Sequence, residues 1–211
     1  MQALDHMLLL LLTILGVMVL AWVFQGIRLH KSYKGDIYAD LYGGFLPYFF
    51  RYIVFRDCSE SGYLRSRIGR HKLVFSVISN EEKQRTKFCI IFYNKGIMVL
   101  CYDRSTGEFW GSSKDQSWNV KRTEMDGKQH IYRHANPTKD MLAYLNRVAA
   151  TFPEVHMEAR LAFPDQADLT HLRSDIKAIC FSQVESELRD VKAEFLSDDE
   201  IKAMYQKLIQ K

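Results

Sequence analysis

The chain has 211 residues, of which 47% are hydrophobic, and a formal net charge of +4 at neutral pH. This charge is too small to produce the strong basic field of a dedicated nucleic-acid-binding protein, so it neither requires nor excludes a nucleic-acid partner. The sequence contains no internal repeat and no low-complexity segment, which excludes the repeat architectures.

An uncharged apolar run from Met7 to Ile27 opens the chain. A helix of this length, at about 1.5 Å per residue, crosses the roughly 30 Å hydrocarbon core of a bilayer. Arg28 and Lys31 follow the run and no Lys or Arg precedes it, which predicts an N-terminus outside and a cytoplasmic C-terminal domain. We therefore expect residues 1–30 to be a single-pass anchor in an inner or plasma membrane. A cleaved signal peptide is disfavoured because no small-x-small site follows Gly26.

About 180 residues follow the anchor, enough for one domain with a hydrophobic core. We divide them into a domain at residues 31–196 and a C-terminal amphipathic helix at residues 197–211. The four cysteines form no C-x-x-C pair, and three of them lie in apolar runs. We expect reduced thiols that pack as small hydrophobic groups in a reducing compartment.

The segment directly after the anchor is rich in aromatic residues. The spacing of Ile37 and Leu41 predicts a short helix, and residues 52–55 predict a short strand. An alternative position for some of these aromatic side chains is the bilayer interface, because the segment begins within a few residues of the anchor.

Three strand-like runs begin at Leu73, Lys87 and Gly96. The turn at residues 94–96 predicts a hairpin between the last two, because Asn and Gly tolerate positive φ. Both runs are almost continuously apolar, as expected for central strands covered on both faces. The residues expected in this core are Phe88, Ile90, Phe92, Val99 and Cys101.

Shorter elements are predicted in the second half. Strands near Glu108 and Lys128 flank a loop that contains Trp118, and Pro137 introduces a helix. Further strands are expected from Met157 and Ile176.

Two capping boxes, Ser182–Glu185 and Ser197–Glu200, open the last two helices, and Phe195 is expected on the apolar face of the first. The first half of the chain is predicted to contain strands, and the second half alternates strands with helices. This order predicts an α/β fold, with one mixed sheet flanked by helices.

The segment from Gly96 to Trp118, together with Asn136 and Pro137, resembles the nuclease-related domain (NERD) family. Members typically contain G-I-x-V-I-E-x-K-x-x-x-G-x-I-x-G, then a Trp, then N-P-x-x-Q at the start of a helix. The residues that match are Gly96, Ile97, Val99, Leu100, Gly107, Gly111, Trp118, Asn136 and Pro137. A weaker match extends from Lys34 to about Leu188. The resemblance implies a restriction-endonuclease-like mixed sheet.

The resemblance also implies metal-dependent phosphodiester cleavage, in which carboxylates hold Mg²⁺ and a Lys assists the attacking water. On this chain the E-x-K positions fall on Cys101 and Asp103, and the metal-binding Asp position falls on Phe88. The helical Glu position falls on Ala39, and the Gln of N-P-x-x-Q falls on Asp140. A soft thiol does not replace a carboxylate toward a hard cation. The resemblance therefore implies a pseudo-nuclease with no catalytic residues, metal or cofactor.

The leading hypothesis for function is a membrane-tethered scaffold that binds the lipid bilayer and one or more protein partners, in an assembly that handles nucleic acid. A second is an active nuclease with relocated ligands, for which the candidates are Asp40, Asp57, Asp103, Glu108 and Lys114.

A third hypothesis is nucleic-acid binding without cleavage, for which the candidates are Arg65, Arg67, Arg70 and Lys72. The histidines show no zinc-ligand spacing, and His71 is expected at the solvated surface.

Overall fold

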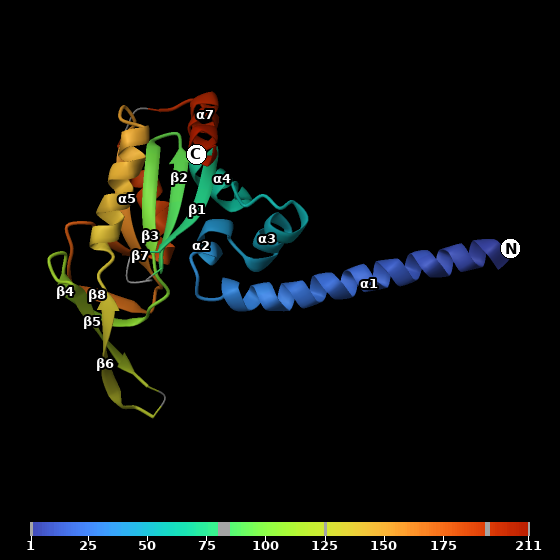
Figure 1. Cartoon of the computed structure of the whole chain (residues 1–211), viewed down its shortest axis with the longest axis horizontal. Helices are drawn as coiled ribbons and strands as arrows, with labels where there is room; N and C mark the ends of the chain where they lie inside the picture. Colours follow the sequence, from blue (N-terminus) through green and yellow to red (C-terminus); the bar gives the residue numbers. More distant parts are fainter. Residues whose placement is uncertain (1, 80–84, 125, 193–194, 211) are drawn as a thin grey trace. The chain divides into compact units, whose positions relative to one another are not determined.

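The computed structural model describes residues 2–79, 85–124, 126–192 and 195–210, in two units, Met1–Lys34 and Gly35–Lys211. The first unit is helix α1 (Gln2–Tyr33; Figure 1). Its portion His6–Tyr33 is long and apolar enough to cross a membrane. The one hydroxyl within the apolar run, on Thr13, donates to the carbonyl of Leu9, 2.8 Å away, so it does not interrupt the helix.

The second unit is built on a five-stranded mixed sheet in the order β1–β2–β3–β7–β9. The first three strands are antiparallel, whereas β7 and β9 run parallel to β3. The strands are β1 (His71–Ser79), β2 (Arg85–Tyr93), β3 (Gly96–Tyr102), β7 (Met157–Phe163) and β9 (Ala178–Cys180).

The central hairpin, β2–β3, has the predicted register and burial. Phe88 pairs with Cys101 and Ile90 pairs with Val99, and all four are buried. Gly96 opens β3 at φ +123°, where a Cβ would collide with the carbonyl of His156, so only glycine fits this turn.

The unit also contains a four-stranded sheet in the order β6–β5–β4–β8, so the single sheet predicted from the sequence is wrong. The strands are β4 (Gly107–Ser112), β5 (Ser117–Thr123), β6 (Gln129–Ala135) and β8 (Ala167–Arg173). The predicted loop around Trp118 is wrong, because Trp118 is a fully buried residue of β5. Its indole Nε1 donates to the carbonyl of Ser112 at 2.9 Å. The sequence does not predict this strand, because Trp118 and Val120 are the only two of its residues that are buried and its apolar pattern is therefore short.

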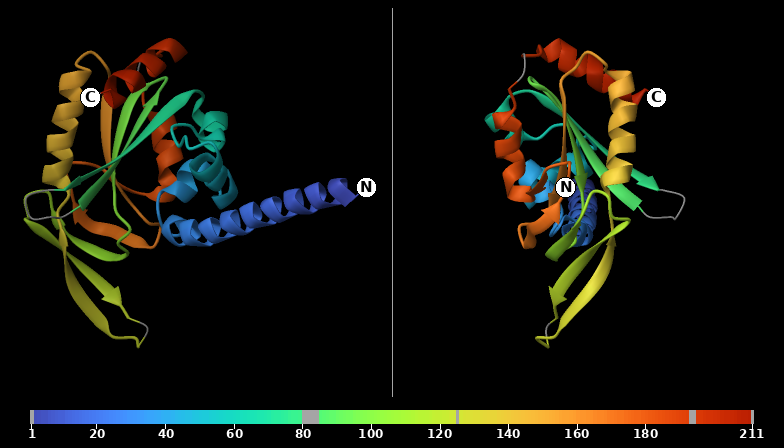
Figure 2. Two further views of the ribbon diagram at one scale, coloured as in Figure 1. Left: turned by 45° about the vertical axis from the view of Figure 1, so that its right-hand side comes forward. Right: turned by 90° about the vertical axis from the view of Figure 1, so that its left-hand side faces the viewer.

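Helices cover both faces of the five-stranded sheet (Figure 2). Helices α5 (Thr138–Thr151) and α7 (Asp198–Ile209) contribute to one apolar core with alternate residues of β2 and β3. The opposite face carries α2 (Tyr38–Tyr42), α4 (Gly62–Ile68) and α6 (Val184–Asp190). The remaining helical segments are α3 (Phe45–Phe49), η1 (Phe50–Val54) and η2 (Phe181–Gln183).

The C-terminal helix α7 belongs to the same unit as the sheet. Ile201 and Met204 are buried in the core, and the Ser197–Glu200 capping box is formed as predicted. The Lys207 ammonium also donates to the carbonyl of Thr151, 2.9 Å away, which joins α7 to the end of α5.

Three local predictions are wrong. Residues 52–55 form no strand, because the chain continues from α3 into the π-helix η1. The capping box before α6 joins Cys180 and Gln183 instead of Ser182 and Glu185. Helix α6 ends at Asp190, so Phe195 lies beyond it and is exposed.

The surface position predicted for His71 is also wrong, because this side chain is buried. Its Nε2 accepts from the backbone N–H of Ser61 at 3.0 Å, and its Nδ1 lies 3.1 Å from the carbonyl of Gly69. Burial lowers the pKa of His71, so the ring is a neutral structural element at neutral pH.

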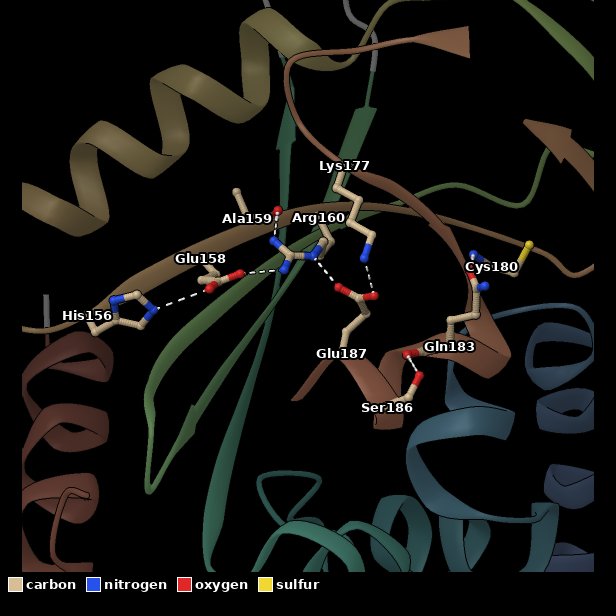
Figure 3. Close-up of polar contacts among 9 residues, drawn as sticks. All are labelled: His156, Glu158, Ala159, Arg160, Lys177, Cys180, Gln183, Ser186 and Glu187. Atoms are coloured by element: carbon tan, nitrogen blue, oxygen red, sulfur yellow. Dashed lines mark hydrogen bonds and ion pairs between the residues drawn. The ribbon is translucent and has the colours of Figure 1, made fainter. Parts of the chain in front are cut away.

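A chain of ion pairs fastens α6 to the sheet (Figure 3). The Arg160 guanidinium of β7 donates to Glu187 of α6 at 2.7 Å and also to Glu158. Lys177 donates to the second oxygen of Glu187 at 2.5 Å. Arg160 is the central member because it contacts both carboxylates.

We expect Arg160→Met to lower the free energy of unfolding by about 2–3 kcal/mol, because it leaves two partly buried carboxylates without their shared cation. Lys177→Met removes one exposed partner and should cost less than about 1 kcal/mol. Urea denaturation of both variants measures the difference. Equal losses would show that Arg160 is not the centre of this network.

Candidate functional site

Two of the positions at which the NERD resemblance places metal ligands, Phe88 and Cys101, lie one pair inside the open end of the β2–β3 hairpin. Phe88 and Cys101 are directly opposite each other and are 0% and 4% exposed. The Phe88 ring packs on the Tyr144 ring of α5, with centroids 4.2 Å apart. Burial raises the pKa of the Cys101 thiol, and the charges of Asp103 and Asp140 raise it further. The thiol is therefore neutral and packed as an apolar group.

Asp103 follows directly after β3. Its Oδ1 accepts from the backbone N–H of Ser105 at 2.6 Å and lies 3.4 Å from Nε2 of His134. Partial burial would raise the pKa of Asp103, but the contacts from His134 and Ser105 outweigh it and hold the pKa well below its usual range. Asp103 is thus an ionised partner of His134, a pairing across 31 residues that no sequence pattern predicts.

Asp140 lies in the first turn of α5 and accepts from the Thr86 hydroxyl at 2.7 Å. Ala39 lies on α2, whose neighbouring residue Tyr38 packs on Phe75. Phe75 pairs with Cys89 and therefore faces the side of the sheet opposite to Phe88. The structure brings four of the five family positions together and places Ala39 on the other face.

The carboxylates considered for a relocated metal site have separate surroundings. Asp57 accepts from the backbone N–H of Ser59, and Glu108 lies between Lys121 and His171. Burial, with a smaller contribution from the charge of Asp165, raises the pKa of Asp40 to about 6. Among the described residues, no three His, Cys, Asp or Glu side chains gather to hold a metal ion.

The four predicted nucleic-acid contacts lie around α4 and the start of β1. Three of them face acidic partners: Arg67 lies 3.4 Å from Glu185, Arg70 2.9 Å from Asp198 and Lys72 2.7 Å from Glu60. A small cavity of about 150 Å³ is lined by Glu60, Arg65, Arg70 and His71. These ion pairs offset much of the positive charge on which the prediction depended.

A different cationic cavity, of about 260 Å³, opens beside Asp103 at the end of the central hairpin. It is lined by Arg85, Lys87, Asp103, Arg104, Ser105 and Arg122. Four cationic side chains from β2, the β3–β4 connection and β5 thus surround the Asp103 carboxylate, which already accepts a hydrogen bond from Ser105. We call this feature the basic cavity.

Asp36 holds two of these cations in place. It is 3% exposed, and one carboxylate oxygen lies 3.2 Å from Lys87 and 2.8 Å from Arg104. Its other oxygen accepts from the backbone N–H of Ile37 at 2.9 Å. No sequence pattern predicts the basic cavity, because its cations come from three elements and only Arg85 and Lys87, at i and i+2, are close together in the sequence.

Comparison of the chain with protein-family models, with curated proteins and with solved structures finds no match in any of the three.

We expect Asp103→Asn to lower the free energy of unfolding by about 1 kcal/mol at pH 7, because solvent partly screens the pair at the Asp103 side chain, which is 42% exposed. A carboxyl group whose pKa is lowered in the folded state stabilises the protein at pH values above its pKa in the unfolded chain, near 4. This stabilisation is lost as the pH falls below that value. The difference between the two proteins should therefore shrink below about pH 4 in urea midpoints measured from pH 7 to pH 3. Asp175→Asn, at an exposed position, is the control, and a pH-independent difference would contradict the assignment.

Proposed function

We propose that this protein is a membrane-tethered, non-catalytic nuclease-related (NERD-like) protein that acts as a scaffold or partner-binding subunit of a larger assembly. One observation carries the proposal. The positions where the resembled family needs carboxylates for Mg²⁺ are held by Phe88 and Cys101, which are buried against Tyr144. Hard cations require oxygen ligands, and this part of the hairpin supplies none.

The five-stranded sheet is, in this proposal, the restriction-endonuclease-like core that the resemblance implies. Its antiparallel hairpin, the following helix α5 and the parallel strand β7 support the proposal, because they bring Phe88, Cys101, Asp103 and Asp140 together.

Helix α1 is proposed to span an inner or plasma membrane with its N-terminus outside. Its support is the length and apolar character of His6–Tyr33 and the cationic residues that follow the apolar run.

A surface for a protein partner is available at strand β6, the terminal strand of the four-stranded sheet. Ile131 and Tyr132 of this strand are exposed. An edge strand with exposed apolar side chains can pair with a strand of another chain.

We expect the purified full-length protein in detergent or nanodiscs to cleave neither DNA nor RNA, single- or double-stranded, with Mg²⁺ or Mn²⁺. The physical reason is that Phe88 and Cys101 supply no oxygen ligand, while the nearby carboxylates of Asp103 and Asp140 already contact Ser105, His134 and Thr86. Cleavage that is abolished by EDTA and by Asp103→Asn or Asp140→Asn would contradict the proposal and favour a relocated site.

Nucleic-acid binding without cleavage is a second candidate, favoured by the basic cavity and not by the Arg65–Lys72 cluster. Phosphate contacts release counterions, so this binding would weaken steeply with salt. In the same preparations, Arg85→Gln with Arg122→Gln should then weaken binding more than Arg67→Gln with Arg70→Gln, whose cations face acidic partners. Equal effects would remove the basic cavity as the binding site. No binding by the parent protein would remove this candidate and leave the protein scaffold.

A further inference from the structure

A patch of exposed apolar side chains lies on the segment formed by α3, η1 and the residue that follows. Its members are Leu46 (65% exposed), Phe50 (46%), Tyr52 (50%), Val54 (41%) and Phe55 (66%). Single exposed apolar residues are ordinary, but a contiguous group usually marks a protein or membrane contact. We call these five residues the α3–η1 patch.

The segment has an inner side that fixes it to the domain. Tyr48 and Phe49 are buried, and the Tyr48 ring stacks on Tyr38 with centroids 4.7 Å apart. Tyr42 packs on the same ring at 5.2 Å. The patch is therefore the outer side of a packed helical segment and not a loose loop.

The backbone of the segment suits an apolar surrounding. Residues Phe45–Val54 are helical throughout, and the backbone N–H of Phe55 donates to the carbonyl of Phe50 at 3.0 Å. Within a bilayer, backbone polar groups need partners inside their own segment. The turn after Phe55, where Arg56 adopts φ +51°, ends this helical stretch.

The arginines of the segment favour a contact with the phosphates of lipid headgroups. Two arginines, Arg51 and Arg56, and no acidic residue lie within residues 45–56, and the first acidic residue after them is Asp57, whose charge interacts with that of Arg51. The Arg51 guanidinium lies 6.0 Å from the centre of the Phe55 ring. Aromatic side chains beside arginine are typical of the membrane–water interface, where the cation meets lipid phosphates.

The patch also follows the membrane-spanning candidate closely in the sequence, with residues 34–44 between them. In a protein anchored by α1, this short connection presents the patch to the bilayer at high effective concentration. We propose that the α3–η1 patch inserts into the bilayer interface as a second lipid contact, which fixes the domain against the membrane surface. This inference rests on the proposed anchoring by α1.

Tryptophan quenching by lipids brominated on their acyl chains tests the proposal in nanodiscs that contain full-length protein. The reporter is Phe55→Trp in a Trp22→Phe background, and its signal is taken as the difference from Trp22→Phe alone, which retains Trp110 and Trp118. The matched control is Phe195→Trp in the same background, at an exposed phenylalanine outside the patch. Interfacial helices bury their apolar face about 5–10 Å deep, so the Phe55→Trp signal should be quenched at least about twofold more than the control. Leu46→Asp with Phe50→Asp in the reporter protein should abolish this excess.

The difference in quenching between the parent protein and Trp22→Phe reports the anchor separately, because Trp22 lies within α1 and both proteins retain Trp110 and Trp118. Quenching of Trp22 without excess quenching at position 55 would overturn the lipid contact and leave the anchor in place. No quenching of Trp22 would instead contradict the anchor on which the inference rests. Equal quenching at positions 55 and 195, together with a detergent-solubilised dimer that Leu46→Asp and Phe50→Asp dissociate, would assign the patch to a second copy of the chain.

Discussion

Burial of the β2–β3 hairpin on both faces is the constraint on which the rest of the second unit depends. Phe88, Ile90 and Val99 form one core with α5 and α7, while Cys89 and Ile91 are buried on the opposite side. A strand that is covered on both faces cannot hold a charge at its centre without a large desolvation cost. This packing fixes the position of α5, which is also joined to β2 by the hydrogen bond from the Thr86 hydroxyl to Asp140.

Polar chemistry is instead concentrated where the hairpin leaves the core. Asp36 binds Lys87 and Arg104 on one side of the sheet, while Asp103 contacts His134 near the second sheet. Each carboxylate accepts hydrogen bonds or pairs with cations of the protein itself, and each therefore joins neighbouring elements of the fold. The four cations of the basic cavity outnumber Asp103, which lines it, and Asp36, which pairs with Lys87 and Arg104, so this end of the sheet keeps a net positive charge.

The sequence predicts those elements whose hydrophobic pattern is strong. The continuous runs of β2 and β3, the helical spacing of α5 and the Ser197 cap of α7 each have a local signal. Strand β8 lacks one, because only Ala167 among its residues is buried, and the second sheet was therefore not foreseen. The π-helix η1 contains aromatic and β-branched residues that favour a strand, and the contacts of Tyr48 and Phe49 with the domain override that preference.

The most direct test of the account is to restore the family carboxylates with Phe88→Asp and Cys101→Glu and to measure unfolding with and without Mg²⁺. The account predicts a loss of more than about 4 kcal/mol that Mg²⁺ does not reverse, because both carboxylates would be buried in an apolar core. Phe88→Leu with Cys101→Ala is the control, with a loss of about 1–3 kcal/mol. A folded double carboxylate variant that Mg²⁺ stabilises would contradict the account and show that the hairpin retains a metal site.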